Sequence, residues 1–124
     1  MWWRKKKDLG CWGEEVAKRY LQGKGYKILA EHWTSRIGEL DLVAKKNGRY
    51  IIVEVKTRTS RAFGTPEEAI DIWKQRKLAK TGELFLLKHH LVDVPWQIDA
   101  VAVEIMEGGR TEIRHLENVV QRYN

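Results

Sequence analysis

The chain has 124 residues, which is the size of one domain, and its apolar residues, 43% of the total, suffice for a single core. Its formal net charge of +6 favours polyanionic partners. The single cysteine, Cys11, excludes an internal disulfide bond and a cysteine-based zinc site. Because no apolar run approaches 18 residues and no apolar segment follows the basic N-terminal residues, we expect no membrane partner and one domain, residues 1–124, in the cytoplasm.

The N-terminal third predicts a basic arm, a helix and a strand. Residues 1–7 combine two tryptophans with four basic residues, and we expect a mobile arm there. Asp8 fits a helix N-cap, and apolar residues at helical spacing predict a helix over about 9–24. Glu14 and Glu15 lie on opposite flanks of its apolar stripe, and periodicity does not choose between them. A strand over about 26–33 and a short loop follow.

The stretch 38–58, GELDLVAKKNGRYIIVEVKTR, has the pattern of a β-hairpin. Asn47-Gly48 between two apolar-rich runs is typical of a type I′ turn, in which both central residues have positive φ. With these two as the turn, Val43 faces Ile52 and Asp41 faces Glu54. Because strand side chains alternate, one face is wholly apolar and is predicted to be the core side: Leu40, Leu42, Ala44, Ile51, Val53 and Val55.

The other face of the predicted hairpin opposes two carboxylates, Asp41 and Glu54. Directly opposed side chains lie only about 4.5–5.5 Å apart, so like charges there are unfavourable. Mg²⁺ prefers oxygen ligands and would relieve the repulsion, and Lys56 on the same face could orient water or stabilise negative charge. These residues predict metal-assisted attack of water on a phosphodiester; the alternative is a solvated strand face.

After the hairpin, the pattern predicts a polar loop and a long helix. Arg58 and Arg61 suit bidentate contact with phosphate, although the loop's composition is also ordinary for a surface loop. Thr65-Pro66-Glu67-Glu68 predicts the start, with a capping box, of a helix to about Lys88, with a break or a change of face near Gly82. One side of this helix is basic (Lys74, Arg76, Lys77 and Lys80). His89 and His90 are interpreted as cations that cap the helix C-terminus.

The C-terminal part predicts two strands. Residues 96–105 are apolar on both faces, which is typical of a buried central strand. Asp99 in this strand is interpreted as a structural hydrogen-bond acceptor rather than as support for a metal site. Gly108-Gly109 predicts a turn into an edge strand over 110–115, and residues 116–123 predict a short helix or a tail.

Four stretches together resemble the YraN family of predicted endonucleases, relatives of the archaeal Holliday-junction resolvases in the PD-(D/E)xK superfamily. They are GEEVAKRYLQGKGYKIL (13–29), the hairpin (38–58), FGTPEEAI (63–70) followed by Lys74, and QIDAVAV (97–103). The resemblance implies a restriction-endonuclease-like α/β fold, a mixed sheet flanked by helices. It selects Glu14 and implies an active-site set of Glu14, Asp41, Glu54 and Lys56. Leu40 stands where the motif's name puts proline.

The resemblance implies a DNA endonuclease dependent on Mg²⁺ or Mn²⁺, acting on branched or flapped DNA. Asp41, Glu54 and the backbone carbonyl of Val55 would hold the metal, Lys56 would position the attacking water, and Glu14 would complete the shell. Contacts to DNA are expected from Arg58, Arg61 and Lys74, and the resolvase relationship implies a homodimer. The alternatives are a nucleic-acid-binding module without catalysis and a protein-interaction domain.

Overall fold

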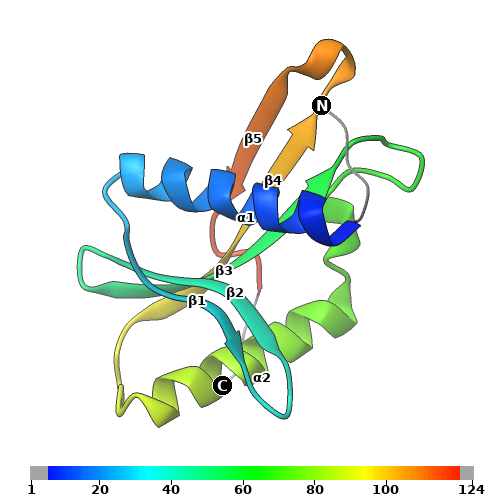
Figure 1. Ribbon diagram of the computed structural model, residues 1–124. Coiled ribbons are helices and arrows are strands. Elements are labelled where there is room, and N and C mark those ends of the chain that lie inside the picture. Colours follow the sequence, from blue (N-terminus) through cyan, green and yellow to red (C-terminus); the bar gives the residue numbers. More distant parts are fainter. Residues whose placement is uncertain (1–5, 121–124) are drawn as a thin grey trace.

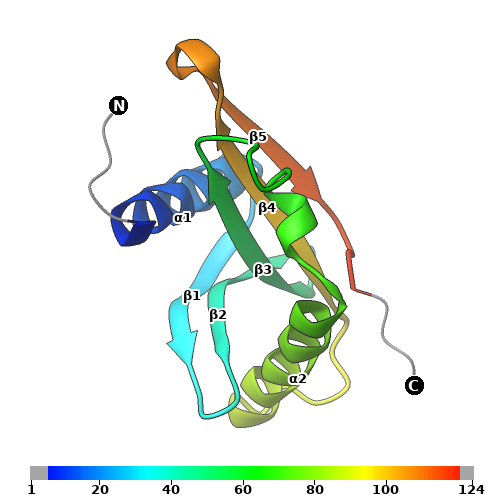
Figure 2. The ribbon, with the colours of Figure 1, turned by 90° about the vertical axis from the view of Figure 1, so that its right-hand side faces the viewer.

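In the computed structural model, residues 6–120 are described, with side chains from residue 8 onward. A five-stranded sheet in the order β1-β2-β3-β4-β5 carries α1 on one face and α2 on the other (Figures 1 and 2). The elements are α1 (Lys6–Gly23), β1 (Lys27–Thr34), β2 (Glu39–Lys46), β3 (Arg49–Arg58), the 3₁₀ turn η1 (Glu67–Ala69), α2 (Ile72–Lys88), β4 (Trp96–Ile105), the 3₁₀ turn η2 (Glu107–Gly109) and β5 (Thr111–Leu116).

The sheet is mixed, as the α/β prediction requires. The strands β1, β2 and β3 are antiparallel neighbours, β3 and β4 are parallel, and β4 and β5 are antiparallel. The parallel pair needs a long crossover connection, which α2 supplies. The prediction of a mixed sheet flanked by helices, consistent with a restriction-endonuclease-like fold, is confirmed. Among the described residues, no helix is both long enough and apolar enough to cross a bilayer.

The hairpin β2–β3 forms in the predicted register. Asn47 and Gly48 have φ of 51° and 78°, the positive values that a type I′ turn requires. Val43 pairs with Ile52, and the ladder continues as far as Leu42 and Val53. Beyond that pair the two strands separate, so Asp41 and Glu54 are not partners in the ladder.

Both faces of the hairpin are buried, which differs from the prediction of one core face and one polar face. Most of the predicted core set packs under α1 with Ala17 and Leu21. The alternate residues Val43 and Ile52 pack under α2. Leu40 was wrongly assigned, because it belongs to the α2 side. Alternation holds only in a regular strand, and β2 ceases to be regular where it leaves β3.

The helix α1 begins earlier than predicted and lies close to the sheet. Lys6 and Lys7 are helical, so only residues 1–5 of the expected arm lie outside the described part of the chain. Asp8 lies in the first turn and not at the N-cap. At Gly13 a Cβ would overlap the Thr57 side chain, so glycine allows α1 to approach β3 directly beside Glu14.

The predicted single helix over residues 65–88 is wrong, because the chain forms η1 and then a separate α2. Ile70 has non-helical φ and ψ of −93° and 77° and interrupts the helix. Asp71 then caps α2 by accepting the Lys74 N–H at 2.9 Å. Thr65 forms no capping box, since its hydroxyl donates to the Glu68 carboxylate instead. No break occurs at Gly82, which is buried within α2.

The predictions of a buried strand β4 and of a structural role for Asp99 are confirmed, and His89 lies at the C-cap of α2. Asp99 is fully buried and accepts hydrogen bonds from Gln97 Nε2, His115 Nε2 and the Asn118 N–H, which is a structural role. His89 Nδ1 lies 2.8 Å from the Phe85 carbonyl in the last turn of α2. No helix follows β5 in residues 117–120, and residues 121–124 lie outside the described range.

Candidate active site

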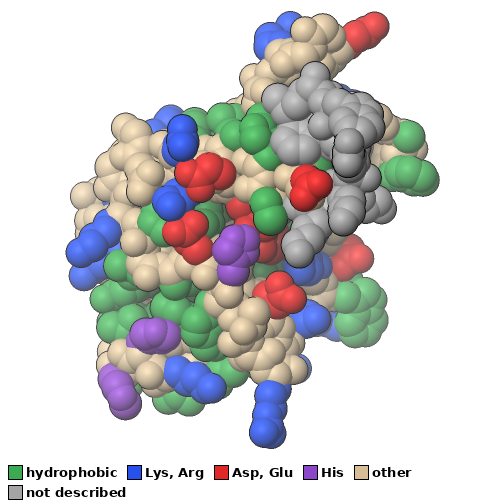
Figure 3. All heavy atoms as spheres, viewed as in Figure 1, with side chains coloured by type: hydrophobic (Ala, Val, Ile, Leu, Met, Phe, Trp, Pro, Cys, Tyr) green, Lys and Arg blue, Asp and Glu red, His purple; other side chains and the backbone are tan. Residues whose placement is uncertain are grey.

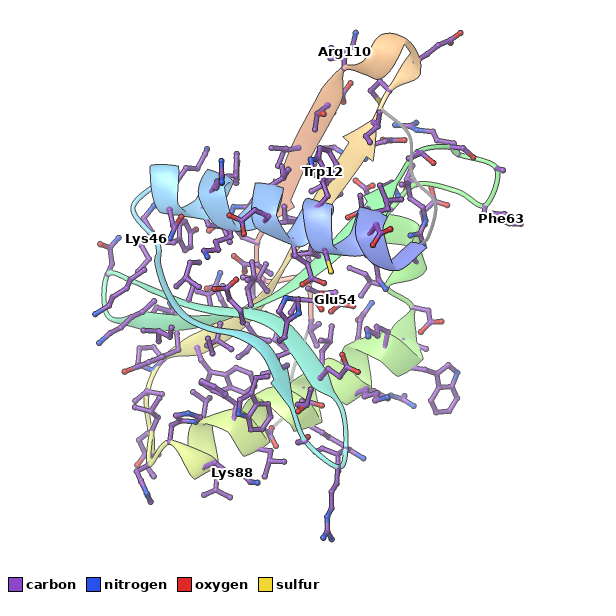
Figure 4. All side chains as sticks on the ribbon, viewed as in Figure 1. Trp12, Lys46, Glu54, Phe63, Lys88 and Arg110 are labelled. Carbon is purple, nitrogen blue, oxygen red and sulfur yellow. The ribbon has the colours of Figure 1, made fainter. Side chains whose placement is uncertain are left out.

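Asp41 and Glu54 meet where β2 leaves β3. Asp41 Oδ2 accepts the Val55 N–H at 2.8 Å, so this carboxylate replaces the ladder bond that the departing strand no longer makes. The N–H and C=O of one residue in a strand point to the same edge, so the Val55 carbonyl also faces this gap. Two carboxylates and one backbone carbonyl are therefore directed to one end of the hairpin, and Glu54 lies in the space between α1 and α2 (Figure 4).

Asp41 and Glu54 repel each other, as the sequence predicts for two neighbouring carboxylates, and this repulsion affects the pKa of Asp41. Burial raises the pKa of Asp41 to about 8, and repulsion by Glu54 and a hydrogen bond between the two carboxyl groups act in the same direction. The Val55 N–H opposes this shift in pKa. Glu54 is only 3% exposed, so solvent does little to screen the pair. Without a cation, the Asp41 carboxyl therefore holds its proton more tightly than an ordinary aspartate does.

Two lysines converge on Glu54. Lys56 Nζ lies 3.5 Å and Lys74 Nζ lies 3.2 Å from the same oxygen, Glu54 Oε2. Both lysines therefore belong to the site, and Lys74, expected only as a DNA contact, enters from the first turn of α2. The adjoining cleft of about 210 Å³ is lined by Glu39, Asp41, Lys74, Lys77 and Leu78.

Glu14 approaches the same end of the hairpin from α1. Burial raises the pKa of Glu14, the negative charges of Glu54 and Glu39 add to this, and His32 opposes it. Its neighbour Glu15 instead pairs with Arg19 and lies near Lys18, so the structure separates the two glutamates that periodicity could not.

His32 is a member of the site that sequence reasoning missed. His32 Nδ1 lies 2.9 Å from Glu14 Oε2, an ion-pair distance without hydrogen-bond alignment. The pairs that flank it, Glu31 with Leu42 and Trp33 with Leu40, place His32 of β1 opposite Asp41 of β2. Its φ of +50° is rare for a residue with a side chain. Several acidic side chains lie close together near the centre of the face shown in Figure 3. No sequence pattern marks this position.

The two arginines predicted to contact DNA differ in their surroundings. Arg58 is half-buried at the end of β3 and donates to the Thr57 carbonyl at 2.9 Å. Arg61 makes two hydrogen bonds to Glu104, at 2.7 and 3.0 Å, so its guanidinium already has an internal partner. Sequence reasoning missed Glu104, which is 2% exposed in β4 and which also accepts from Arg114 at 3.0 Å. The pKa of Glu104 is lowered, chiefly by its hydrogen bonds from Arg61.

The model of the uncharacterised protein family UPF0102 matches residues 13–103, a range that contains every residue placed in the site. This chain belongs to UPF0102, the YraN family. It is 43% identical over 112 residues to a UPF0102 protein of Syntrophomonas wolfei, covering 90% of this chain and 96% of the relative. A UPF0102 protein of Alkaliphilus oremlandii is 39% identical over 114 residues, with 90% and 97% covered. The relative from Nocardia farcinica is 41% identical over 117 residues, with 92% and 90% covered.

The donor set of this UPF0102 protein fits a hard divalent cation. Among the described side chains, no group of three or more His, Cys, Asp or Glu is drawn together tightly enough to hold one metal ion. Asp41, Glu54 and the Val55 carbonyl provide two carboxylates and one carbonyl, and Mg²⁺ is usually bound through one or two carboxylates with several waters retained. The raised pKa of Asp41 is the electrostatic cost that such a cation would remove.

Proposed function

We propose that this UPF0102 protein is a Mg²⁺- or Mn²⁺-dependent DNA endonuclease that acts on branched or flapped DNA in the cytoplasm. The observation that supports this most strongly is the convergence of Asp41 and Glu54 at the point where β2 leaves β3. Lys56 Nζ lies 3.5 Å from Glu54 Oε2 at the same point. The burial and mutual repulsion of the two carboxylates serve no purpose in a solvated strand face.

The proposal gives each residue a role that its position supports. A bound divalent cation would polarise the phosphoryl oxygen and lower the pKa of a water molecule. Asp41, Glu54 and the Val55 carbonyl would hold that cation. Lys56 orients the attacking water and stabilises the negative charge that develops on the phosphate. Glu14, which lies in α1, would complete the shell of that cation.

The phosphate backbone would be bound beside this cluster. Arg58 lies at the end of β3, and Lys74 and Lys77 line the cleft next to Asp41. Arg61 is the weaker of the two arginine candidates, because its guanidinium is already paired with Glu104. A homodimer, implied by the resolvase relationship, is proposed as the assembly that would cut two strands.

The test is metal-dependent cleavage of a panel of blunt, flapped and four-way DNA. We expect Lys56→Ala and Asp41→Asn to reduce the cleavage rate by about 10²-fold or more, the order of loss seen when transition-state charge loses a stabilising group. Glu14→Gln should also lose activity, whereas Glu15→Gln, its matched control on the opposite flank of α1, should retain it.

The competing function is a nucleic-acid-binding module without catalysis, in which the basic residues bind and the carboxylates are inert. That alternative predicts DNA binding without Mg²⁺-dependent cleavage in all of these proteins. Equal cleavage by the wild type, Lys56→Ala and Asp41→Asn would point to a contaminating nuclease and would remove the endonuclease proposal.

A further inference from the structure

Two large aromatic side chains in the segments that follow the candidate active-site strand β3 are exposed to solvent. Phe63 is 97% exposed and Trp73 is 72% exposed. Phe63 lies at the tip of the loop between β3 and η1 and points away from the molecule (Figure 4). Phe63 also opens the FGTPEEAI stretch, which the proposed chemistry leaves unexplained.

The loop that carries Phe63 is anchored by buried and partly buried ion pairs. Arg61 is held by two hydrogen bonds to Glu104, and the Gly64 N–H closes a turn onto the Arg61 carbonyl at 3.0 Å. On the far side of the turn, Glu67 accepts two hydrogen bonds from Arg114, at 2.7 and 2.8 Å. Phe63 is therefore displayed from a turn whose two ends are fixed to β4 and β5.

Trp73 lies in the first turn of α2, the helix that brings Lys74 to the proposed catalytic cluster. It precedes Lys74, whose ammonium lies 3.2 Å from Glu54 Oε2. The Arg76 guanidinium lies 5.3 Å from the centre of the Trp73 ring, so a positive charge and an aromatic face are presented together.

The charge around these aromatic rings is complementary to a polyanion. Residues 56–80 contain seven Lys or Arg against three Asp or Glu. Of the three acids, Glu67 is neutralised by Arg114 and Asp71 is used as the cap of α2. Basic groups interleaved with exposed aromatic side chains are the pattern by which proteins bind single-stranded nucleic acid, with bases stacked on the rings.

We propose that Phe63 and Trp73 form a stacking surface for the unpaired bases of a DNA single strand next to the proposed cleavage site. This inference rests on the proposed function and specifies its substrate class. Bases inside a continuous duplex are stacked on each other and do not reach these rings. The protein would therefore prefer DNA in which a duplex adjoins unpaired nucleotides, such as a flap, over a blunt duplex.

Binding is measured without metal in the Lys56→Ala background, with a fluorescent blunt duplex, a flapped duplex and a single strand. Phe63→Ala and Trp73→Ala are each expected to weaken binding to the flapped and single-stranded DNA by about tenfold or more, with blunt-duplex affinity changed by less than about twofold. Phe63→Leu, which keeps an apolar side chain but removes the aromatic face, should behave like Phe63→Ala. Leu87→Ala, which removes another exposed apolar side chain near the other end of α2, should bind like its parent.

Three outcomes would overturn the stacking surface. The first is unchanged affinity of Phe63→Ala and Trp73→Ala for unpaired DNA, and the second is an equal loss on blunt duplex. The third is a dimer of the parent protein that these substitutions convert to a monomer in sedimentation, which would assign the surface to a second copy of this chain.

The proposed function is read separately, from Mg²⁺-dependent cleavage by the wild type against Lys56→Ala. If the wild type cleaves DNA and the aromatic variants bind DNA as their parent does, the nuclease proposal is retained and the stacking surface is rejected. If the aromatic variants selectively lose binding to unpaired DNA but the wild type does not cleave DNA, the nuclease proposal is rejected. The stacking surface would then belong to a DNA-binding module without catalysis.

Discussion

When no cation is bound, the surroundings of Asp41 favour its protonated form up to about pH 8. Its pKa is raised to about 8, chiefly by burial, so its stabilising contribution is complete below the unfolded value of 3.8 and is lost as pH rises through about 8. Metal-free protein should therefore lose stability between about pH 4 and pH 8, and a cation that replaces the proton should restore it.

Asp41→Asn tests this electrostatic account. The amide oxygen can still accept the Val55 N–H, but the side chain no longer ionises, so we expect the metal-free variant to be more stable than the wild type at pH 8.5 by about 1 kcal/mol or more. Urea unfolding in EDTA at pH 5 and at pH 8.5 measures the difference. If the free energy of unfolding depends on pH in the same way in both proteins, ionisation of Asp41 does not destabilise the metal-free protein.

The contact between His32 and Glu14 predicts that His32 orients the Glu14 carboxylate at the proposed metal site. Glycine and asparagine both tolerate the φ of +50°, but only asparagine retains a side-chain donor. We expect His32→Gly to weaken Mn²⁺ binding about tenfold, as loss of an outer-shell partner does, and His32→Asn to recover part of it. The increase in melting temperature with Mn²⁺ measures affinity without any need for activity. Equal Mn²⁺ affinity in the wild type and His32→Gly would mean that the contact is incidental.

At the scale of elements, the site depends on how closely α1 lies on β3. Gly13→Ala places a methyl group against the Thr57 hydroxyl, so α1 must shift and carry Glu14 with it. We expect a destabilisation of about 1–3 kcal/mol and a loss of cleavage activity.

Gly10→Ala is the matched control on the same helix, because a Cβ there meets nothing within 4 Å. It should be neutral or stabilising, by up to about 1 kcal/mol, since alanine favours the helix. Thr57→Ala should restore part of the stability that Gly13→Ala loses. Equal melting temperatures for Gly10→Ala and Gly13→Ala would mean that the close approach is not required.

At the scale of the whole molecule, residues 56–80, which contain the proposed DNA contacts, carry seven Lys or Arg against three Asp or Glu, in a chain whose formal net charge is +6. If binding neutralises about five phosphates, the logarithm of the association constant should fall with the logarithm of salt concentration with a slope of about −4 to −5. Titration of a labelled duplex from 50 to 300 mM salt gives the slope. A slope near zero would favour the protein-interaction alternative.

The local parts of this molecule follow from the sequence alone. Asn47-Gly48 determined the turn, and the turn determined which residues of β2 and β3 pair with one another. Because side chains alternate along a strand, this pairing also determined which of them share a face of the sheet. The buried β4 followed from apolar residues on both of its faces. The sequence predicts the set Glu14, Asp41, Glu54 and Lys56, because a hairpin and one motif indicate three of these residues and the family resemblance supplies the fourth.

The tertiary structure alone decided which distant groups meet. The packing of α2 brought Lys74 to Glu54, the crossover to β4 brought Glu104 to Arg61, and the departure of β2 from β3 moved Leu40 to the other core. His32 reached Glu14 only because α1 lies across the sheet at Gly13. Turn chemistry and alternation act between neighbours in the chain, whereas these contacts depend on how helices settle on a sheet, which no short stretch of sequence encodes.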